Sequence, residues 1–198
     1  MKRIFALMLA APLILAACNT KPKNTITIDS GDGKEKVTVD LNQAQNAAAE
    51  MQKKAEQLKT LTPVTLDQLK AMMPETLVGG KRKSYSANSA MGTAMAEARY
   101  EINDSTDLEL TIFDCAGEAG YGLYNMQYFG MINMQSESES EYSKTIDFNG
   151  GKALEKCQKD GSNCELTYVS GERFLVLLKG RHMSAESLKN IAGQLSIK

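Results

Sequence analysis

Several residue types that often carry chemistry are scarce or absent. The chain of 198 residues contains no tryptophan and a single histidine, His182. A metal centre built on several histidines is therefore excluded. Basic residues are not in excess either, because 23 Lys and Arg stand against 24 Asp and Glu. Proteins that bind nucleic acid neutralise its phosphates with surplus positive charge, so we do not expect this chain to bind DNA or RNA.

A hydrophobic run long enough to cross a membrane is also missing. The longest, residues 4–17, falls short of the roughly 20 residues that a span needs. It follows Lys2 and Arg3 and ends in small residues. This combination is typical of a secretory signal peptide, which we place at residues 1–17.

The signal ends in Leu15-Ala16-Ala17-Cys18, which resembles the lipobox of bacterial lipoproteins. The resemblance implies cleavage before Cys18 and attachment of diacylglycerol and palmitate to it. Two or more acyl chains anchor a protein stably. Because Asn19 rather than Asp follows, the resemblance implies the inner leaflet of the outer membrane, facing the periplasm. The alternative is an ordinary signal peptide with an incidental cysteine.

Two of the other three cysteines flank a hairpin signal. Cys157 and Cys164 lie on either side of Asp160-Gly161. A two-residue loop there places the cysteines directly opposite each other, with Cα atoms about 4.5–5.5 Å apart, within disulfide range. We predict a Cys157–Cys164 disulfide. The alternatives are free thiols or half of a zinc site whose other half is missing.

Cys115 is the cysteine left over, either a buried small side chain or a reactive thiol. Thiol catalysis would need a base, and His182 is the only imidazole. The chain also lacks a Gly-x-Ser-x-Gly elbow, a phosphate-binding loop and a calcium loop. We therefore predict no enzymatic activity, no cofactor and no metal. A thiol-dependent enzyme using Cys115 is the alternative.

Residues 18–61, which precede the folded domain, are expected to form a lipid anchor, a tether and a helical stalk. Residues 25–40 alternate in polarity, as in a short hairpin or a partly disordered linker. Residues 41–60 are strong helix formers with few large apolar side chains, so we expect a solvated stalk that holds the domain off the membrane.

Residues 62–198 predict an α+β domain, with an antiparallel sheet of about five to seven strands and helices packed on one face. Thr65 and Gln68 match a capping box at the start of a helix. Loops are expected at 117–122 and 136–143, and further helices at 121–134 and after Ser184. The alternating segments predict strands at 81–88, 94–102, 108–112, 145–148, 152–157, 164–169 and 173–179.

The helix at 121–134 is dense in Tyr, Met and Phe. Such a stripe over a sheet is usually core, but Met-rich surfaces also adapt to varied ligands. The pocket interpretation makes Tyr121, Tyr124, Tyr128 and Met131 ligand-binding residues. Both interpretations remain open from the sequence.

From Met73 onward the chain contains Met73-Pro74-Glu75, Gly80-Lys81-Arg82, Ala90-Met91-Gly92 and Ala96-Glu97-Ala98-Arg99-Tyr100. With these residues it resembles a family of bacterial envelope proteins without an assigned activity, and its element order resembles the Mog1/PsbP-like α+β fold. Neither resemblance brings a catalytic motif. We expect an outer-membrane-anchored periplasmic lipoprotein of non-enzymatic binding or accessory type, with an envelope protein as partner. The alternative is a carrier of a small apolar ligand.

Overall fold

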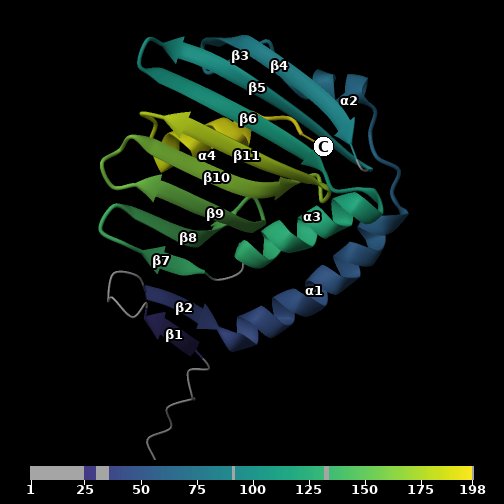
Figure 1. Ribbon diagram of the computed structural model, residues 1–198, viewed down its shortest axis with the longest axis vertical. Helices are drawn as coiled ribbons and strands as arrows, with labels where there is room; N and C mark the ends of the chain where they lie inside the picture. Colours follow the sequence, from purple (N-terminus) through teal and green to yellow (C-terminus); the bar gives the residue numbers. More distant parts are fainter. Residues whose placement is uncertain (1–24, 30–35, 91, 132–133, 198) are drawn as a thin grey trace, which may run out of the picture.

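The computed structural model describes residues 25–29, 36–90, 92–131 and 134–197 (Figure 1). The predicted signal peptide and Cys18 lie outside this part. No helix within the described ranges is long and apolar enough to span a membrane. The elements are β1 (Thr25–Asp29), β2 (Lys36–Asp40), α1 (Leu41–Thr60), α2 (Leu66–Ala71), β3 (Thr76–Leu77), β4 (Gly80–Ala90), β5 (Thr93–Asn103), β6 (Thr106–Asp114), α3 (Gly117–Gly130), β7 (Gln135–Glu137), β8 (Glu141–Phe148), β9 (Gly151–Gln158), β10 (Asn163–Ser170), β11 (Phe174–Arg181) and α4 (Ala185–Gln194).

All described strands join one antiparallel sheet, in the order β1-β2-β7-β8-β9-β10-β11-β6-β5-β4-β3. Two meanders, β3 to β6 and β7 to β11, meet where β6 pairs with β11. The β1–β2 hairpin extends the sheet beyond β7. The α+β class is confirmed, but the sheet has eleven strands rather than five to seven. The extra strands are short ones. β3 and β7 are too short to show an alternating pattern in the sequence, and β1 and β2 join the main sheet instead of forming a separate hairpin.

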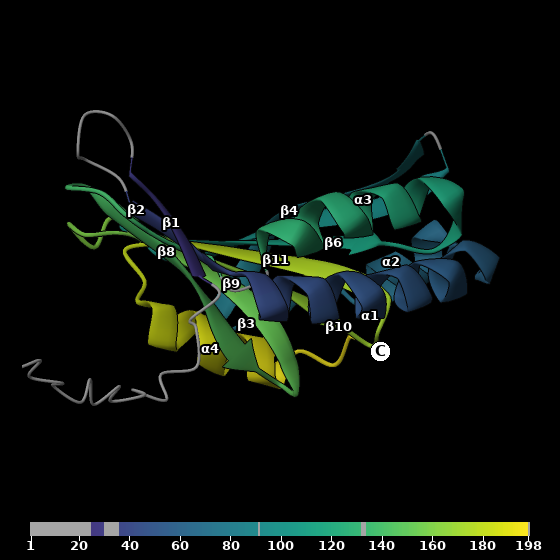
Figure 2. The ribbon, with the colours of Figure 1, turned by 90° about the horizontal axis from the view of Figure 1, so that it is seen from below.

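The helices cover both faces of the sheet, which corrects the expectation of one face. Because β2 and β3 lie near opposite ends of the sheet, the chain between them must cross it, and so must the chain from β6 to β7. The long helices α1 and α3 make these two crossings side by side. Figure 2 shows α3 and α4 on opposite sides of the sheet.

Each face has its own hydrophobic core. The first core lies between the sheet and α2 and α4, where Leu69 and Leu188 are fully buried. The second lies under α1 and α3. Along β11, Phe174 and Val176 enter the first core and Leu175 enters the second, since strand side chains alternate. This strand is therefore covered on both faces and lies inside the sheet, between β10 and β6.

The C-terminal half of α1 packs on the domain. Ala55 and Leu58 are buried, and Lys54 pairs with Glu172 in the β10–β11 turn at 2.6 Å. The expectation of a fully solvated stalk is therefore wrong for this half. Leu58 belongs to the same core cluster as Tyr124 of α3, so α1 and α3 pack against each other.

Two expected loops are regular structure in whole or in part. The loop expected at 136–143 is limited to residues 138–140, with β7 and β8 on either side, and α3 begins at Gly117 despite its three early glycines. A Cβ atom at Gly120 would lie 2.5 Å from the carbonyl carbon of Cys115. Glycine is therefore needed at this position for the helix to pack closely after β6, at a cost in helix propensity.

A buried ion pair lies at one end of the β6–β11 strand pair, where β6 ends and β11 begins. The Asp114 carboxylate is fully buried and accepts hydrogen bonds from the Arg173 side chain at 3.0 and 2.7 Å. It also accepts from the backbone N–H groups of Val64 at 2.7 Å and Ala116 at 3.1 Å. Arg173 donates as well to the carbonyl of Thr62 at 2.9 Å. One carboxylate thus fixes the α1–α2 connection to the sheet.

We expect Asp114→Asn to lower the free energy of unfolding by about 3–5 kcal/mol, because Arg173 and two backbone donors lose a buried anionic partner. Urea denaturation measures this change. The control is Asp107→Asn, which breaks the more exposed pair with Arg181 and should cost about 1 kcal/mol or less. Equal losses in the two variants would contradict a dominant role for the buried pair.

Candidate functional site

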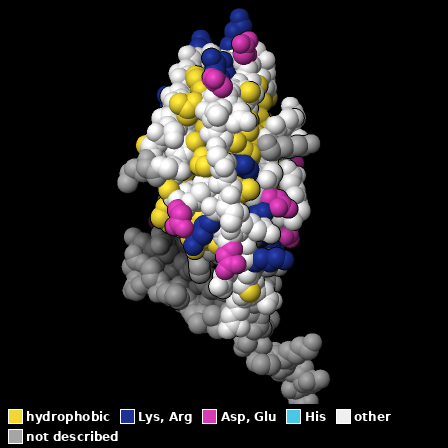
Figure 3. All heavy atoms as spheres, turned by 90° about the vertical axis from the view of Figure 1, so that its right-hand side faces the viewer, with side chains coloured by type: hydrophobic (Ala, Val, Ile, Leu, Met, Phe, Trp, Pro, Cys, Tyr) yellow, Lys and Arg dark blue, Asp and Glu magenta, His cyan; other side chains and the backbone are white. Residues whose placement is uncertain are grey.

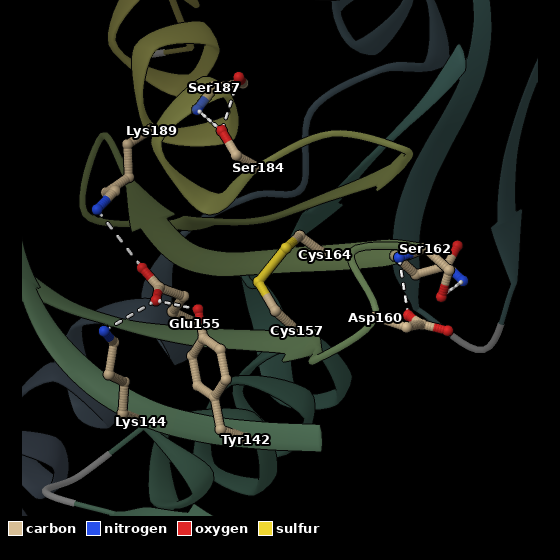
Figure 4. Close-up of a disulfide and its surroundings, with 11 residues drawn as sticks. Tyr142, Lys144, Glu155, Cys157, Asp160, Ser162, Cys164, Ser184, Ser187 and Lys189 are labelled. Atoms are coloured by element: carbon tan, nitrogen blue, oxygen red, sulfur yellow. Dashed lines mark hydrogen bonds and ion pairs between the residues drawn. A yellow bond between two sulfur atoms is a disulfide. The ribbon is translucent and has the colours of Figure 1, made fainter. Parts of the chain in front are cut away.

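The β9–β10 hairpin carries the predicted disulfide (Figure 4). Cys157 and Cys164 pair directly across the two strands, with Cα atoms 4.1 Å apart, and both are buried. In the turn, Asp160 accepts a hydrogen bond from the Ser162 N–H at 2.9 Å. The disulfide and the register that the Asp160-Gly161 signal predicted are confirmed.

A pocket of about 440 Å³ lies between this hairpin and the beginning of α4. Its lining includes the disulfide, Tyr142, Met183 and Lys159, whose ammonium is paired with Glu137 at 2.7 Å. Ser184, the N-cap of α4, also contributes and accepts from the Ser187 N–H. The volume falls within the usual range for small-molecule sites. The lining combines apolar and polar side chains.

Beside the disulfide, Glu155 is a buried carboxylate held by three side chains (Figure 4). Its Oε1 accepts from the Tyr142 hydroxyl at 2.9 Å and pairs with Lys144 at 3.1 Å. Its Oε2 makes no hydrogen bond among the described residues and lies 3.5 Å from the Lys189 ammonium of α4. The cluster therefore ties α4 to β8 and β9 through charge.

The surroundings keep Glu155 ionised. Burial acts to raise its pKa, but the hydrogen bonds from Lys144 and Tyr142 and the charges of Lys144 and Lys189 outweigh it, so the net pKa lies below the ordinary value. Burial and the bond to Glu155 raise the pKa of Tyr142. A carboxylate held in its charged form is suited to structural pairing rather than to donating a proton.

Sequence reasoning missed this cluster, although part of its signal was present. A turn at Asn149-Gly150 places Lys144 directly opposite Glu155, and the structure has this pairing. Glu155 also lies two residues from Cys157, so both point to the same face. The contribution of Lys189 depends on where α4 packs, which no local pattern indicates.

The aromatic and Met stripe of α3 lies mainly in the second core. Tyr124 and Met131 are buried there beside Leu58. Tyr121 is half-buried, with the Lys59 ammonium 4.4 Å from its ring centre. Tyr128 belongs to α3, but its side chain lies outside the described part. These contacts favour the core interpretation over a ligand pocket.

Hydrophobic side chains also reach the surface where α1 leads into α2, on the side of the molecule that Figure 3 presents. Leu61 and Leu66 are each 40% exposed there. Charged groups surround this region in Figure 3. Exposed apolar residues of this number are ordinary on a protein surface and do not by themselves indicate a binding site.

Cys115 is fully buried, and its position does not fit a nucleophile. Burial raises the pKa of its thiol to about 12, so the reactive thiolate is scarce at neutral pH. Its N–H donates to the carbonyl of Arg173, before β11, whereas His182 follows the other end of that strand. Eight strand residues span about 26 Å, which separates thiol and imidazole. Among the described residues, no three His, Cys, Asp or Glu side chains converge as metal ligands do.

We expect Cys115 to resist alkylation in the folded protein. In the chain from residue 18 carrying Cys18→Ser, iodoacetamide at neutral pH should add to no cysteine rapidly, because the one free thiol is buried and protonated. In denaturant it should add to one cysteine, and after reduction to three, as mass spectrometry counts. Rapid single modification of the folded chain at Cys115 would contradict this assignment.

We expect Glu155→Gln to lower the free energy of unfolding at pH 7 by about 1–3 kcal/mol, since the charged hydrogen bonds are lost. A carboxyl with a lowered folded pKa stabilises the fold above its unfolded pKa, and this contribution is lost as pH falls through the folded value. The difference between wild type and variant should therefore disappear in acid. Denaturant titrations from pH 7 to about pH 3 measure it. Glu172→Gln, at an exposed pair with Lys54, is the control and should change little; an acid-independent loss in Glu155→Gln would contradict the assignment.

Comparisons with known proteins give no relative from which a role can be transferred. No protein-family model matches the chain, and neither the curated proteins nor the solved structures contain a match. The resemblances to bacterial envelope proteins and to the Mog1/PsbP-like fold therefore remain predictions.

Proposed function

We propose that this chain is a lipoprotein of the bacterial outer membrane that faces the periplasm and serves as a non-enzymatic binding or accessory module. The observation that carries the proposal is the sequence Leu15-Ala16-Ala17-Cys18 at the end of a signal peptide. The Cys157–Cys164 disulfide supports it, because such bonds persist in oxidising compartments such as the periplasm.

The distance between the proposed anchor and the folded body is short. The sheet begins at Thr25, seven residues after Cys18. Seven residues reach at most about 25 Å. Residues 36–60 belong to the sheet and to a helix that packs on it, so they do not lengthen the connection. We therefore propose that the body sits near the lipid headgroups instead of at the end of a long stalk.

The side-chain chemistry favours binding over catalysis. Cys115, the residue on which a thiol enzyme would depend, is buried with a raised pKa. Glu155 is held as an ion by Lys144 and Lys189. Tyr124 and Met131 fill a core. The edges of the sheet and the pocket beside the disulfide remain as the surfaces through which the domain would act.

We expect Cys18→Ser to release the protein from membranes. In cells that produce the full chain, the wild type should float with membrane vesicles in a density gradient, because two or more acyl chains hold it stably. The variant should stay with the soluble periplasmic fraction. Cys115→Ser, which alters the other unpaired cysteine, is the control and should float. Membrane association that survives Cys18→Ser would contradict the lipid anchor.

A further inference from the structure

The strand β4 has an open outer edge. Strand β5 pairs with β4 from Lys81 to Ala90, whereas β3 pairs only with Gly80 and Lys81. The Arg82 N–H donates to the carbonyl of Glu75. Beyond that point, within the described ranges, no strand pairs with the outer side of β4 from Ser84 to Ala90. Such an edge presents unpaired N–H and C=O groups that can bind another strand.

The composition of this edge leaves the backbone accessible. Proteins usually block an edge with Lys, Pro, a bulge or a very short strand. In β4 the bulge lies between Arg82 and Ser84, and the charge of Lys83 is paired with Glu101 at 3.1 Å. The rest of the strand carries no charge and no proline. It reads Ser84-Tyr85-Ser86-Ala87-Asn88-Ser89-Ala90.

We propose that the outer edge of β4 from Ser84 to Ala90 is a docking site for an extended segment of a partner protein, which joins the sheet as an additional strand. Backbone hydrogen bonds from alternate residues would supply the affinity. Tyr85 and Ala87 pack against the first core, while Ser86 and Asn88 are exposed on the opposite side. A segment that alternates apolar and polar side chains fits these two faces.

Two arguments favour a partner segment over a second copy of this chain. Seven strand residues offer about 23 Å of contact, which is small for two folded bodies that must bury about 1,200–2,000 Å² to associate stably. An extended segment can bind through strand pairing alone and does not need to bury so large an area. The second argument rests on the proposed lipid anchor. Near β1 the sheet is held at the membrane, and β4 lies at the other end, up to about 43 Å away, where other envelope proteins can reach it (Figure 1).

The test uses a synthetic peptide with the sequence of residues 93–103, because residues 93–99 of this strand already pair with Ser84 to Ala90 in unbroken register. The labelled peptide is titrated into the full chain, purified from membranes in detergent, and into the Cys18→Ser chain. Fluorescence polarisation measures affinity, and amide chemical shifts locate the site. We expect saturable binding with shifts confined to residues 84–90 and their neighbours. A peptide N-methylated at alternate residues should bind about tenfold more weakly or worse, since it loses backbone donors.

Ser86→Pro and Ala87→Pro provide a matched pair of variants. Adjacent N–H groups in an edge strand alternate between the sheet and the outside, so one proline removes an outward N–H and the other a ladder bond. The variant that keeps the melting temperature identifies the outward position, and it should lower peptide affinity about tenfold.

Three results would overturn the proposal. The first is no binding to the folded chain at millimolar peptide. The second is binding whose shifts lie at β1 or elsewhere. The third is a dimer of this chain, seen by sedimentation, that the outward proline variant abolishes, because the edge would then serve a second copy. The peptide result on the Cys18→Ser chain is independent of anchoring, so failure here is distinguishable from failure of the proposed lipid anchor.

Discussion

The pairing of β6 with β11 is the interaction on which the fold depends. It joins two meanders into one sheet, with Asp107 opposite Arg181 at one end and Asp114 opposite Phe174 at the other. Salt bridges close both ends, and the pair at Asp114 is buried while the pair at Asp107 is partly exposed. Because the meanders meet in the middle, the chain must cross the sheet twice. The helices α1 and α3 make those crossings, and the second core lies beneath them.

Features set by neighbouring residues were predictable from the sequence. The Cys157–Cys164 disulfide follows from a turn that fixes its own register, and the capping box at Thr65 and Gln68 is present in the structure. The number of strands and the coverage of both faces depend on pairings between distant segments. The glycines at 117–122 indicated a loop, but Gly120 lies in the helix Gly117–Gly130, where a side chain would clash with the backbone of Cys115 in the connection after β6.

In the candidate site, too, some features are set by neighbouring residues and others by distant segments. Lys144 lies opposite Glu155 for a local reason, since the Asn149-Gly150 turn sets that register, but Lys189 joins them only because α4 packs where it does. The stripe of α3 could be core or pocket from its sequence, and the position of α1 decides: Leu58 packs into the same cluster as Tyr124 and Met131. A helix expected to stand in solvent thus completes a core.

The central claim is that an exported, lipid-anchored chain presents this sheet close to the membrane. Intact mass spectrometry of the protein extracted from bacterial membranes tests it most directly. The account predicts a chain that begins at Cys18, carries the mass of a diacylglycerol and a further acyl group, and gains two hydrogens on reduction. An unmodified Cys18, or a chain that retains residues 1–17, would contradict it.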